Sequence, residues 1–413
     1  MKPSNWEKAR LKDVIQFNPI EKIQKGSIGK KIGMDKLQPF QRKVEGFERA
    51  MFTGGARFRN GDTLMARITP CLENGKTAQV NILDNDEIGF GSTEFVVMRE
   101  KKGYSVSDFI YYLAISPRLR DIAIKSMTGT SGRQRAQINV IKNTMMEIPP
   151  IEEQKIIAYI LSCFDDKINV ITKINHHLEA IAQAIFKHWF VDFEFPNENG
   201  EPYKSSGGEM VESRFGLIPK GWTIASLDEI ARFINGLAMQ KYRPDDNENG
   251  LPVLKIRELR NGFTDNESDR CTHQLSNDHL IENGNIVFSW SGSLLVKIWG
   301  GGKCGLNQHL FKVESKKYAK WFYYYWTKHY LRKFDSIAKD KATTMGHIKR
   351  KDLTDSLVVI PTGQVYAKAD ALLSKLLDLQ ISLNCQSHYL VSIRDTLLPK
   401  LMSGEIWMPV EGS

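Results

Sequence analysis

Two loops in the sequence combine small residues with cations, a composition typical of contacts with nucleic acid. One spans residues 128–137, TGTSGRQRAQ, and the other spans residues 339–351. Small residues let backbone amides approach phosphates, arginine suits a guanine edge and glutamine an adenine edge. Earlier loops add further cations in both halves of the chain. The candidate DNA-binding residues are Arg57, Arg59, Thr128, Arg133, Arg135, Gln137, Lys297, Lys303, Lys341, Thr343, Lys349 and Arg350.

The distribution of charge favours a polyanionic partner. The chain has 57 Lys and Arg against 48 Asp and Glu, a net charge of +9. The excess of cations lies in residues 1–148 and 221–360, and two basic blocks suggest two contacts with one nucleic acid. Two plainer interpretations stay open: a net charge of this size also serves solubility, and each cation taken singly suits a solvated surface.

Sequence patterns for catalysis are weak. An adenine methyltransferase would need an Asn/Asp-Pro-Pro-aromatic motif and a nucleotide hydrolase a phosphate-binding loop, and the sequence contains neither. The triplets Glu153-Gln154-Lys155 and Asp165-Asp166-Lys167 look like nuclease metal sites, but both lie at expected helix starts, where acids cap backbone amides. We therefore predict that the chain has neither catalytic residues nor a metal site.

The sequence is an internal duplication with a period of about 213 residues. Trp6, Leu11, Val14 and Phe17 recur 216 residues later as Trp222, Leu227, Ile230 and Phe233. A turn followed by an apolar strand occurs at residues 61–66 and again at 284–289. Aromatic runs at 109–113 and 321–326 also correspond, and their helical spacing predicts core rather than base stacking. Each copy ends in a short strand and a proline that precede a long helix.

The two long helices carry apolar residues in the alternating spacing of three and four that is typical of a coiled coil. Each stripe contains one amide, Asn175 or Gln386, a kind of residue that often fixes helix register. The predicted pairing residues are Ile168, Ile171, Asn175, Leu178, Ile185, Leu376, Leu379, Leu383, Gln386, Leu390 and Leu397. We expect these helices to pair with each other; packing of each helix on its own domain is the alternative.

The expected fold class is α/β (α+β), with two similar domains joined by two long antiparallel helices in a pseudo-twofold arrangement. Residues 1–148 form the first domain, 149–195 a central helical region, 196–220 a linker, 221–360 the second domain and 361–406 a C-terminal helical region. The linker follows from an abundance of turn-forming residues. The sequence has no apolar run long enough to cross a membrane and no secretory signal, so a cytoplasmic location is expected.

Four stretches resemble the specificity (S) subunits of type I restriction-modification systems, and the resemblance extends over essentially the whole chain. They are IPPIEEQKII at 148–157, AIFKHWFVDFEFP at 184–196, GLIPKGW at 216–222 and LLPKLMSGEI at 397–406. The resemblance implies a non-catalytic subunit whose two target recognition domains each read one half of a split site in double-stranded DNA. The conserved helices would set the distance between the halves.

The resemblance also implies partners. Two adenine-N6 methyltransferase (M) subunits would dock on the helices and bring S-adenosylmethionine, and restriction (R) subunits would use ATP and magnesium, so this chain itself would bind no cofactor. The second copy departs from the pattern, because residues 361–364 are shorter than 149–154 and lack the acidic pair. Two other functions stay open: a stand-alone duplicated nuclease, and a coiled-coil scaffold for proteins only.

Overall fold

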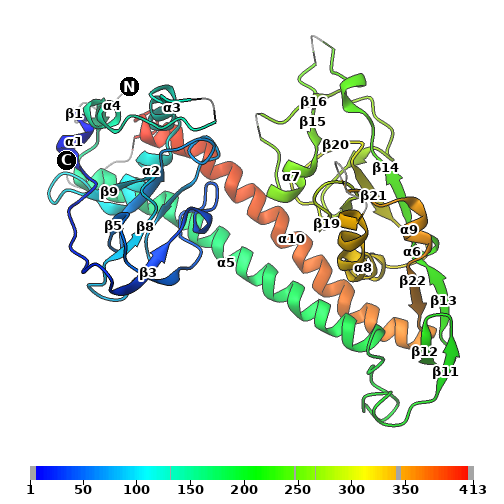
Figure 1. Ribbon diagram of the computed structural model, residues 1–413. Coiled ribbons are helices and arrows are strands. Elements are labelled where there is room, and N and C mark those ends of the chain that lie inside the picture. The colour runs from blue at the N-terminus through cyan, green and yellow to red at the C-terminus, as the bar shows by residue number, and fades with distance from the viewer. Residues whose placement is uncertain (1–5, 131, 246–247, 266, 341–345, 408–413) are drawn as a thin grey trace. The chain divides into compact units, whose positions relative to one another are not determined.

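The chain folds into two compact units. The computed structural model describes residues 6–130, 132–245, 248–265, 267–340 and 346–407. The first unit is Met1–Ile168 with Leu390–Ser413, and the second is Asn169–Tyr389. Two long helices, α5 (Ile151–Phe190) and α10 (Gly363–Met402), contribute residues to both units (Figure 1). The start of α10 at Gly363 shows that the shorter sequence before the second helix still permits a helix as long as the first.

Three small sheets build the first unit. β1 (Glu7–Arg10) pairs with β10 (Met145–Ile148) and joins the two ends of the domain. A four-stranded sheet has the order β2-β9-β6-β7, and a second has the order β4-β3-β8-β5, with β3 and β8 parallel. Their bounds are β2 Ile15–Phe17, β3 Ile28–Ile32, β4 Glu48–Met51, β5 Ala56–Phe58, β6 Thr63–Ala66, β7 Thr77–Gln79, β8 Gly89–Gly91 and β9 Phe95–Glu100. The short helices are α1 Leu11–Val14, η1 Met34–Lys36, α2 Ser107–Ile115, α3 Pro117–Lys125 and α4 Ile138–Asn143.

The second unit repeats these three sheets in the same strand orders. They are β13-β22, β14-β21-β18-β19 and β16-β15-β20-β17, with β15 and β20 parallel. The strands are β13 Thr223–Ser226, β14 Arg232–Asn235, β15 Leu251–Leu254, β16 Arg270–Cys271, β17 Leu280–Ile281, β18 Ile286–Ser289, β19 Leu295–Ile298, β20 Cys304–Leu306, β21 Leu310–Glu314 and β22 Leu357–Ile360. The helices are α6 Leu227–Ile230, η2 Met239–Lys241, α7 Ile256–Asn261, α8 Lys320–Asp340 and α9 Arg350–Thr354.

Strand register confirms the predicted duplication residue by residue. Phe17 of β2 lies opposite Met98 of β9, and Phe233 of β14 lies opposite Val313 of β21. Before β6 and β18, the chain turns at a glycine with positive φ in both copies, 88° at Gly61 and 83° at Gly284. A side chain is rarely tolerated in that conformation, which explains why both copies have glycine there.

The aromatic runs form the cores of the two units, as predicted. Every residue from Phe109 to Ile115 in α2 is buried, and so is every residue from Trp321 to Trp326 in α8. The Trp321 indole also donates a 2.8 Å hydrogen bond to Asp370 of α10. These rings anchor the long helices to the sheets and are inaccessible for base stacking.

The segment predicted as a linker contains ordered structure. β11 (Met210–Ser213) and β12 (Gly216–Pro219) form an antiparallel hairpin. Before the hairpin, the rings of Phe195 and Tyr203 stack with centroids 4.5 Å apart. Ile218 is buried in the core of the second unit. A few large apolar residues therefore fold a segment whose average composition is that of a flexible connection.

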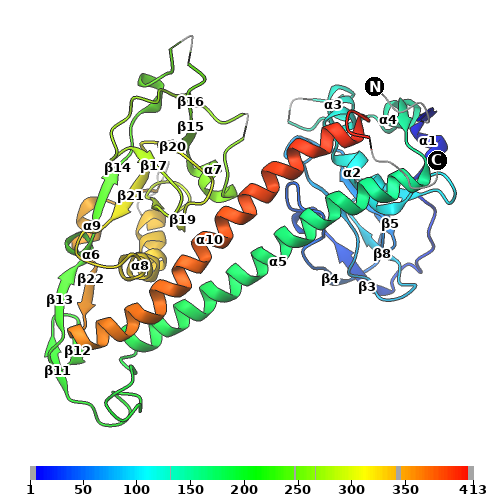
Figure 2. The ribbon, with the colours of Figure 1, turned by 180° about the vertical axis from the view of Figure 1, so that it is seen from behind.

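In the second unit, segments of α5 and α10 lie side by side, as seen in both views (Figure 2). The Asn175 side-chain amide donates a 2.8 Å hydrogen bond to the side-chain oxygen of Asn384. On α5, Ile171 is buried, and the half-buried predicted residues are Ile168, Asn175, Leu178 and Ile185.

The prediction for α10 is wrong in phase by about one residue. Gln386 is exposed and Leu379 is 46% exposed. Gln380 is buried and Asn384 binds Asn175 of α5, so these two residues lie on the line along which α10 contacts α5, here called the contact line. The predicted residues Leu376, Leu383, Leu390 and Leu397 are half-buried. The apolar stripe predicted the wrong phase because polar residues of α10 have partners on α5 and are therefore buried.

Candidate nucleic-acid interface

The loop of residues 128–137 connects α3 to α4 and gathers four predicted residues. Thr128 and Arg135 exchange backbone hydrogen bonds of 3.1 and 2.9 Å, which close the loop at its base. The Gln137 amide donates a 2.6 Å hydrogen bond to the Thr128 hydroxyl, so it also fixes the loop. Thr128, Arg133, Arg135 and Gln137 are all exposed. The described part of the loop therefore presents exposed cations, and backbone hydrogen bonds close its base.

Arg135 belongs to a charged group of three residues, here called the first cluster: Arg67, Glu94 and Arg135. The Glu94 carboxylate accepts hydrogen bonds from Arg135 Nε at 2.9 Å and Nη2 at 2.7 Å, and from Arg67 Nε at 3.2 Å. The hydrogen bond from Arg135 lowers the pKa of Glu94; burial opposes this shift and Arg67 reinforces it. The first cluster has two cations and one anion. Arg67 and Glu94 were not predicted, because they are far from the loop in sequence.

Arg57 and Arg59 make contacts that hold the first unit together. Arg59 Nε and Nη2 donate to the Glu21 carboxylate at 2.7 and 2.9 Å, and Arg99 donates to the same carboxylate at 2.6 Å. Burial raises the pKa of Glu21, but its hydrogen bonds to both arginines outweigh burial and lower it. Arg57 donates to the Glu21 backbone carbonyl and lies over the Phe52 ring at 5.2 Å. These contacts orient both guanidinium groups within the first unit, and Arg59 stays exposed.

Lys297 and Lys303 differ in accessibility. Lys297, in β19, is half-buried and donates a 2.6 Å hydrogen bond to the Arg260 carbonyl. Burial lowers its pKa, and the nearby charges of Lys328 and Arg260 act in the same direction. Lys303 is exposed in the turn before β20. Of the two, Lys303 is the better placed for a phosphate.

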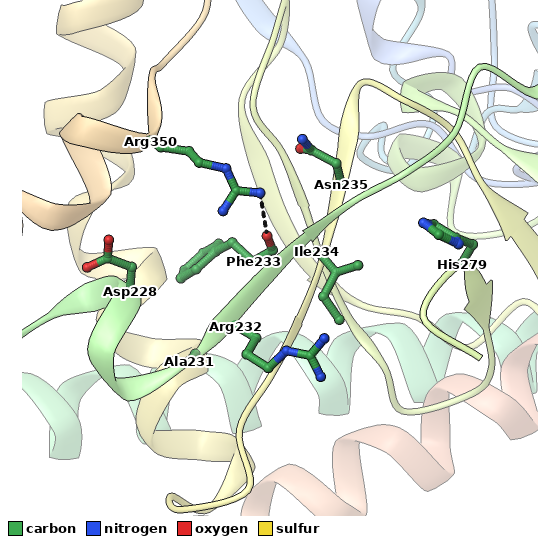
Figure 3. Close-up of a pocket in the computed structure, with 8 residues that line it drawn as sticks. All are labelled: Asp228, Ala231, Arg232, Phe233, Ile234, Asn235, His279 and Arg350. Carbon is green, nitrogen blue, oxygen red and sulfur yellow. Dashed lines mark hydrogen bonds between the residues drawn. The ribbon is translucent and has the colours of Figure 1, made fainter. Parts of the chain in front are cut away.

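The second predicted loop is described only in part, since Lys341 and Thr343 lie outside the described residues. Lys349 and Arg350 are exposed at the start of α9. Arg350 lines a pocket and donates a 3.2 Å hydrogen bond to the Phe233 carbonyl (Figure 3). Arg232 also lines this pocket, but its guanidinium is held by Glu314 and Asp278. Arg350 therefore places a guanidinium at the wall of this pocket.

Beside Arg350 lies an aromatic group of three residues, here called the second cluster: Trp290, His309 and His347. The Arg350 guanidinium lies 5.9 Å from the Phe311 ring, and Phe311 lies 5.8 Å from the Trp290 ring. Trp290 in turn lies 6.1 Å from the His309 ring and 6.2 Å from the His347 ring. Trp290 and His309 are half-buried, and His347 is exposed. Trp290 and His309 were not predicted, because no local motif marks them.

The acids of the two nuclease-like triplets have structural partners. Glu153 accepts a 2.9 Å hydrogen bond from the Trp6 indole. Asp165 forms a 2.7 Å ion pair with Arg394 and accepts a hydrogen bond from Tyr112. Within the described residues, no three His, Cys, Asp or Glu side chains are arranged to hold a metal ion. Among the helices of the same residues, none is long and apolar enough for a membrane span.

Comparisons with known proteins relate both copies to one family. The family model for the type I restriction modification DNA specificity domain matches residues 3–180 and 219–384. The MjaIX specificity subunit of Methanocaldococcus jannaschii is 29% identical over 309 residues, covering 73% of this chain and 69% of that protein. The HindI specificity subunit of Haemophilus influenzae is 23% identical over 407 residues, covering 84% and 87%. The solved S subunit from M. genitalium shares the fold, with a TM-score of 0.51 at 15% identity over 96% of each chain.

Proposed function

Because the chain belongs to the family of type I restriction modification DNA specificity domains, we propose that it is a non-catalytic subunit that reads a split DNA site for a type I restriction-modification complex. The observation that carries the proposal is the duplication of one fold, with the same three strand orders in each copy. Two copies of a reading domain suit a target with two separated half-sites.

The accessible cations divide into two proposed roles. Lys303 and Lys349 are exposed point charges suited to phosphates, which set the position of a protein on DNA. Arg133 and Arg135 can form paired hydrogen bonds with base edges, which carry sequence information. Gln137 is assigned to holding the loop, because its amide nitrogen donates to the Thr128 hydroxyl and the Arg135 carbonyl. Lys341 and Thr343 remain proposed contacts. Arg57 and Lys297 are assigned to the fold, because both are half-buried and engaged within the domain. Arg59 is exposed and binds Glu21 as Arg135 binds Glu94, so it remains a proposed contact.

Exposed apolar side chains on the long helices support the recruitment of protein partners. In the first unit, Tyr159 of α5 is 70% exposed. In the second unit, Ile181 of α5 and Tyr389 of α10 are exposed, at 50% and 67%. These side chains are accessible to protein partners. We assign them to two adenine-N6 methyltransferase subunits; restriction subunits complete the complex, which acts in the cytoplasm, and the partners bring S-adenosylmethionine, ATP and magnesium.

The test begins with the methylated adenines of the host genome, which define the split consensus. Binding of the purified chain, alone and with its methyltransferase subunits, is then measured on a duplex with that consensus and on one with both half-sites scrambled. We expect tighter binding to the consensus, and an affinity that falls linearly with salt on logarithmic axes. Arg133→Ala should weaken discrimination at one base position, whereas Lys303→Ala should weaken binding equally on both duplexes.

Two results would contradict the proposal. Strand scission by the chain alone with magnesium would identify a nuclease. The absence of salt-dependent binding to any duplex, together with intact binding of protein partners, would identify a scaffold.

A further inference from the structure

In the first unit, backbone hydrogen bonds place the first cluster at the ends of three chain segments. The Arg67 amide donates to the Glu94 carbonyl at 3.0 Å, where β6 ends and β9 begins. The Ala136 amide donates to the Arg67 carbonyl at 2.8 Å. Ile68 and Arg135 form an isolated antiparallel bridge. These contacts bring Arg67, Glu94 and Arg135 together independently of their side chains.

In the second unit, the same backbone contacts place the second cluster. The Trp290 amide donates to the His309 carbonyl at 3.4 Å, where β18 ends and β21 begins. The Ile348 amide donates to the Trp290 carbonyl at 3.1 Å, and Ser291 forms an isolated bridge with His347. Arg67 therefore corresponds to Trp290, Glu94 to His309 and Arg135 to His347.

Sheet register supports this correspondence independently. Ala66, the last residue of β6, lies opposite Phe95, the first of β9. Ser289, the last residue of β18, lies opposite Leu310, the first of β21. In each copy, one cluster residue directly follows the first strand and another directly precedes the second strand. These residues are Arg67 and Glu94 in the first copy, and Trp290 and His309 in the second. One backbone site therefore occurs in both copies.

The two clusters differ in chemistry although their backbones match. The first contains two guanidinium groups around a carboxylate, and the second contains an indole and two imidazoles. All six side chains are half-buried or exposed, so none is confined to the core. Because the same backbone site forms around either set, the fold does not dictate these side chains. What they contact outside the chain is then the remaining constraint on their chemistry.

Glu94 leaves part of Arg135 available to a ligand. A guanidinium has five N–H donors, and Glu94 binds at Nε and Nη2 of Arg135. The edge formed by Nη1 and Nη2 can still donate two parallel hydrogen bonds, the geometry that matches O6 and N7 of guanine. The carboxylate thus orients the guanidinium without occupying all of it.

The second cluster consists of three aromatic rings and contains no permanent cation. His309 Nδ1 lies 3.0 Å from the Ser291 hydroxyl and His309 Nε2 lies 3.3 Å from the Gln308 side-chain nitrogen, so both ring nitrogens have partners that orient the imidazole. An apolar ring in the major groove distinguishes thymine by its methyl group. This chemistry fits an A·T pair better than a G·C pair.

We propose that these equivalent clusters are the specificity-determining positions of the two domains: the first reads a guanine, and the second reads an A·T pair. The inference rests on the proposed function, because it assigns bases to the half-sites of the same DNA target. It adds which residues make the two half-sites different.

The test uses the chain assembled with its methyltransferase subunits and a library of duplexes in which one position of the consensus is varied at a time. Arg135→Ala should reduce discrimination by about tenfold to a hundredfold at one G·C position of one half-site. Trp290→Ala, with Trp290→Phe as a second and milder variant, should do the same at one A·T position of the other half-site. Lys303→Ala, an exposed cation outside both clusters, is the matched control and should leave every preference unchanged.

Circular dichroism and assembly with the methyltransferase subunits verify folding of each variant. Folded variants that lose affinity equally on all duplexes, or that change both half-sites together, would overturn the assignment while leaving the proposed function intact. A wild-type complex without sequence preference would instead refute the proposed function itself.

Discussion

Arg394 Nη1 lies 2.7 Å from Asp165 Oδ1, and each side chain is only 7% exposed. Tyr112 of α2 donates a 2.6 Å hydrogen bond to the other oxygen of Asp165. In the first unit, this pair therefore joins the last part of α10 to α5 and to the core. Burial lowers the pKa of Arg394, but the charges of Asp165 and Asp395 outweigh it and raise the pKa, so the guanidinium stays charged.

Removal of the cation from this buried pair should be costly. Arg394→Leu leaves the Asp165 carboxylate buried without its partner, and we expect the free energy of unfolding to fall by about 3–5 kcal/mol. Urea denaturation, followed through the unfolding transition of the first unit, measures this loss of stability. The double variant Asp165→Leu/Arg394→Leu should recover most of it, because no buried charge remains. A loss for Arg394→Leu no greater than that for Lys125→Leu, which breaks the exposed ion pair between Lys125 and Asp121, would contradict this role.

The amide pair on the contact line of the second unit should show similar coupling with smaller energies. Asn384→Leu removes the acceptor of the Asn175 amide. Leaving a buried polar group without a partner costs about 1–3 kcal/mol. Asn175→Leu/Asn384→Leu should be close to the wild type in stability. A double-mutant cycle by urea denaturation measures the coupling, and strictly additive effects would show that the hydrogen bond does not stabilise the helix pair.

Acid should separate Glu94 from Arg135 only below the ordinary pKa of a glutamate carboxyl, 4.5. The hydrogen bond from Arg135 lowers the pKa of Glu94, although burial opposes this. The pair therefore contributes stability above the ordinary pKa, and that contribution is lost as the pH falls through the lowered value. The Glu94 carboxyl resonance in an NMR titration should move at a higher pH in Arg135→Ala than in the wild type. Equal midpoints would show that Arg135 does not hold the carboxylate.

The sequence was sufficient to predict the duplication, since its signals are local and occur twice. Phe17 and Phe233, or Gly61 and Gly284, each repeat a strand or turn whose geometry depends on a few neighbours. The aromatic runs at 109–113 and 321–326 showed helical spacing, and that pattern predicted their burial correctly.

The sequence was insufficient where long-range partners decide the outcome. Asn384 lies on the contact line because Asn175, 209 residues earlier, supplies a hydrogen bond. Arg59 appeared to be a surface cation, but Glu21 binds it. The two clusters share no sequence pattern at all, because matching backbone contacts bring together segments that are distant along each copy.

The length of the long helices should set the gap between the half-sites. The pairs Asp165–Arg394 and Asn175–Asn384 are ten residues apart along both α5 and α10, so the helices keep one antiparallel register. A heptad inserted after Ile168 in α5 and after Leu390 in α10 preserves both pairs and the face of the seam. Seven residues add about 10.5 Å at 1.5 Å per residue.

That increment corresponds to about three base pairs at 3.4 Å each. We therefore expect the double insertion to bind a duplex whose half-sites are about three base pairs farther apart, and to bind the original spacing less tightly. Competition binding on duplexes with gaps varied by single base pairs measures the preference. A heptad inserted into α5 alone is the control, since it shifts the register and should weaken binding at all spacings. If the double insertion still prefers the original gap, the helices do not set the distance.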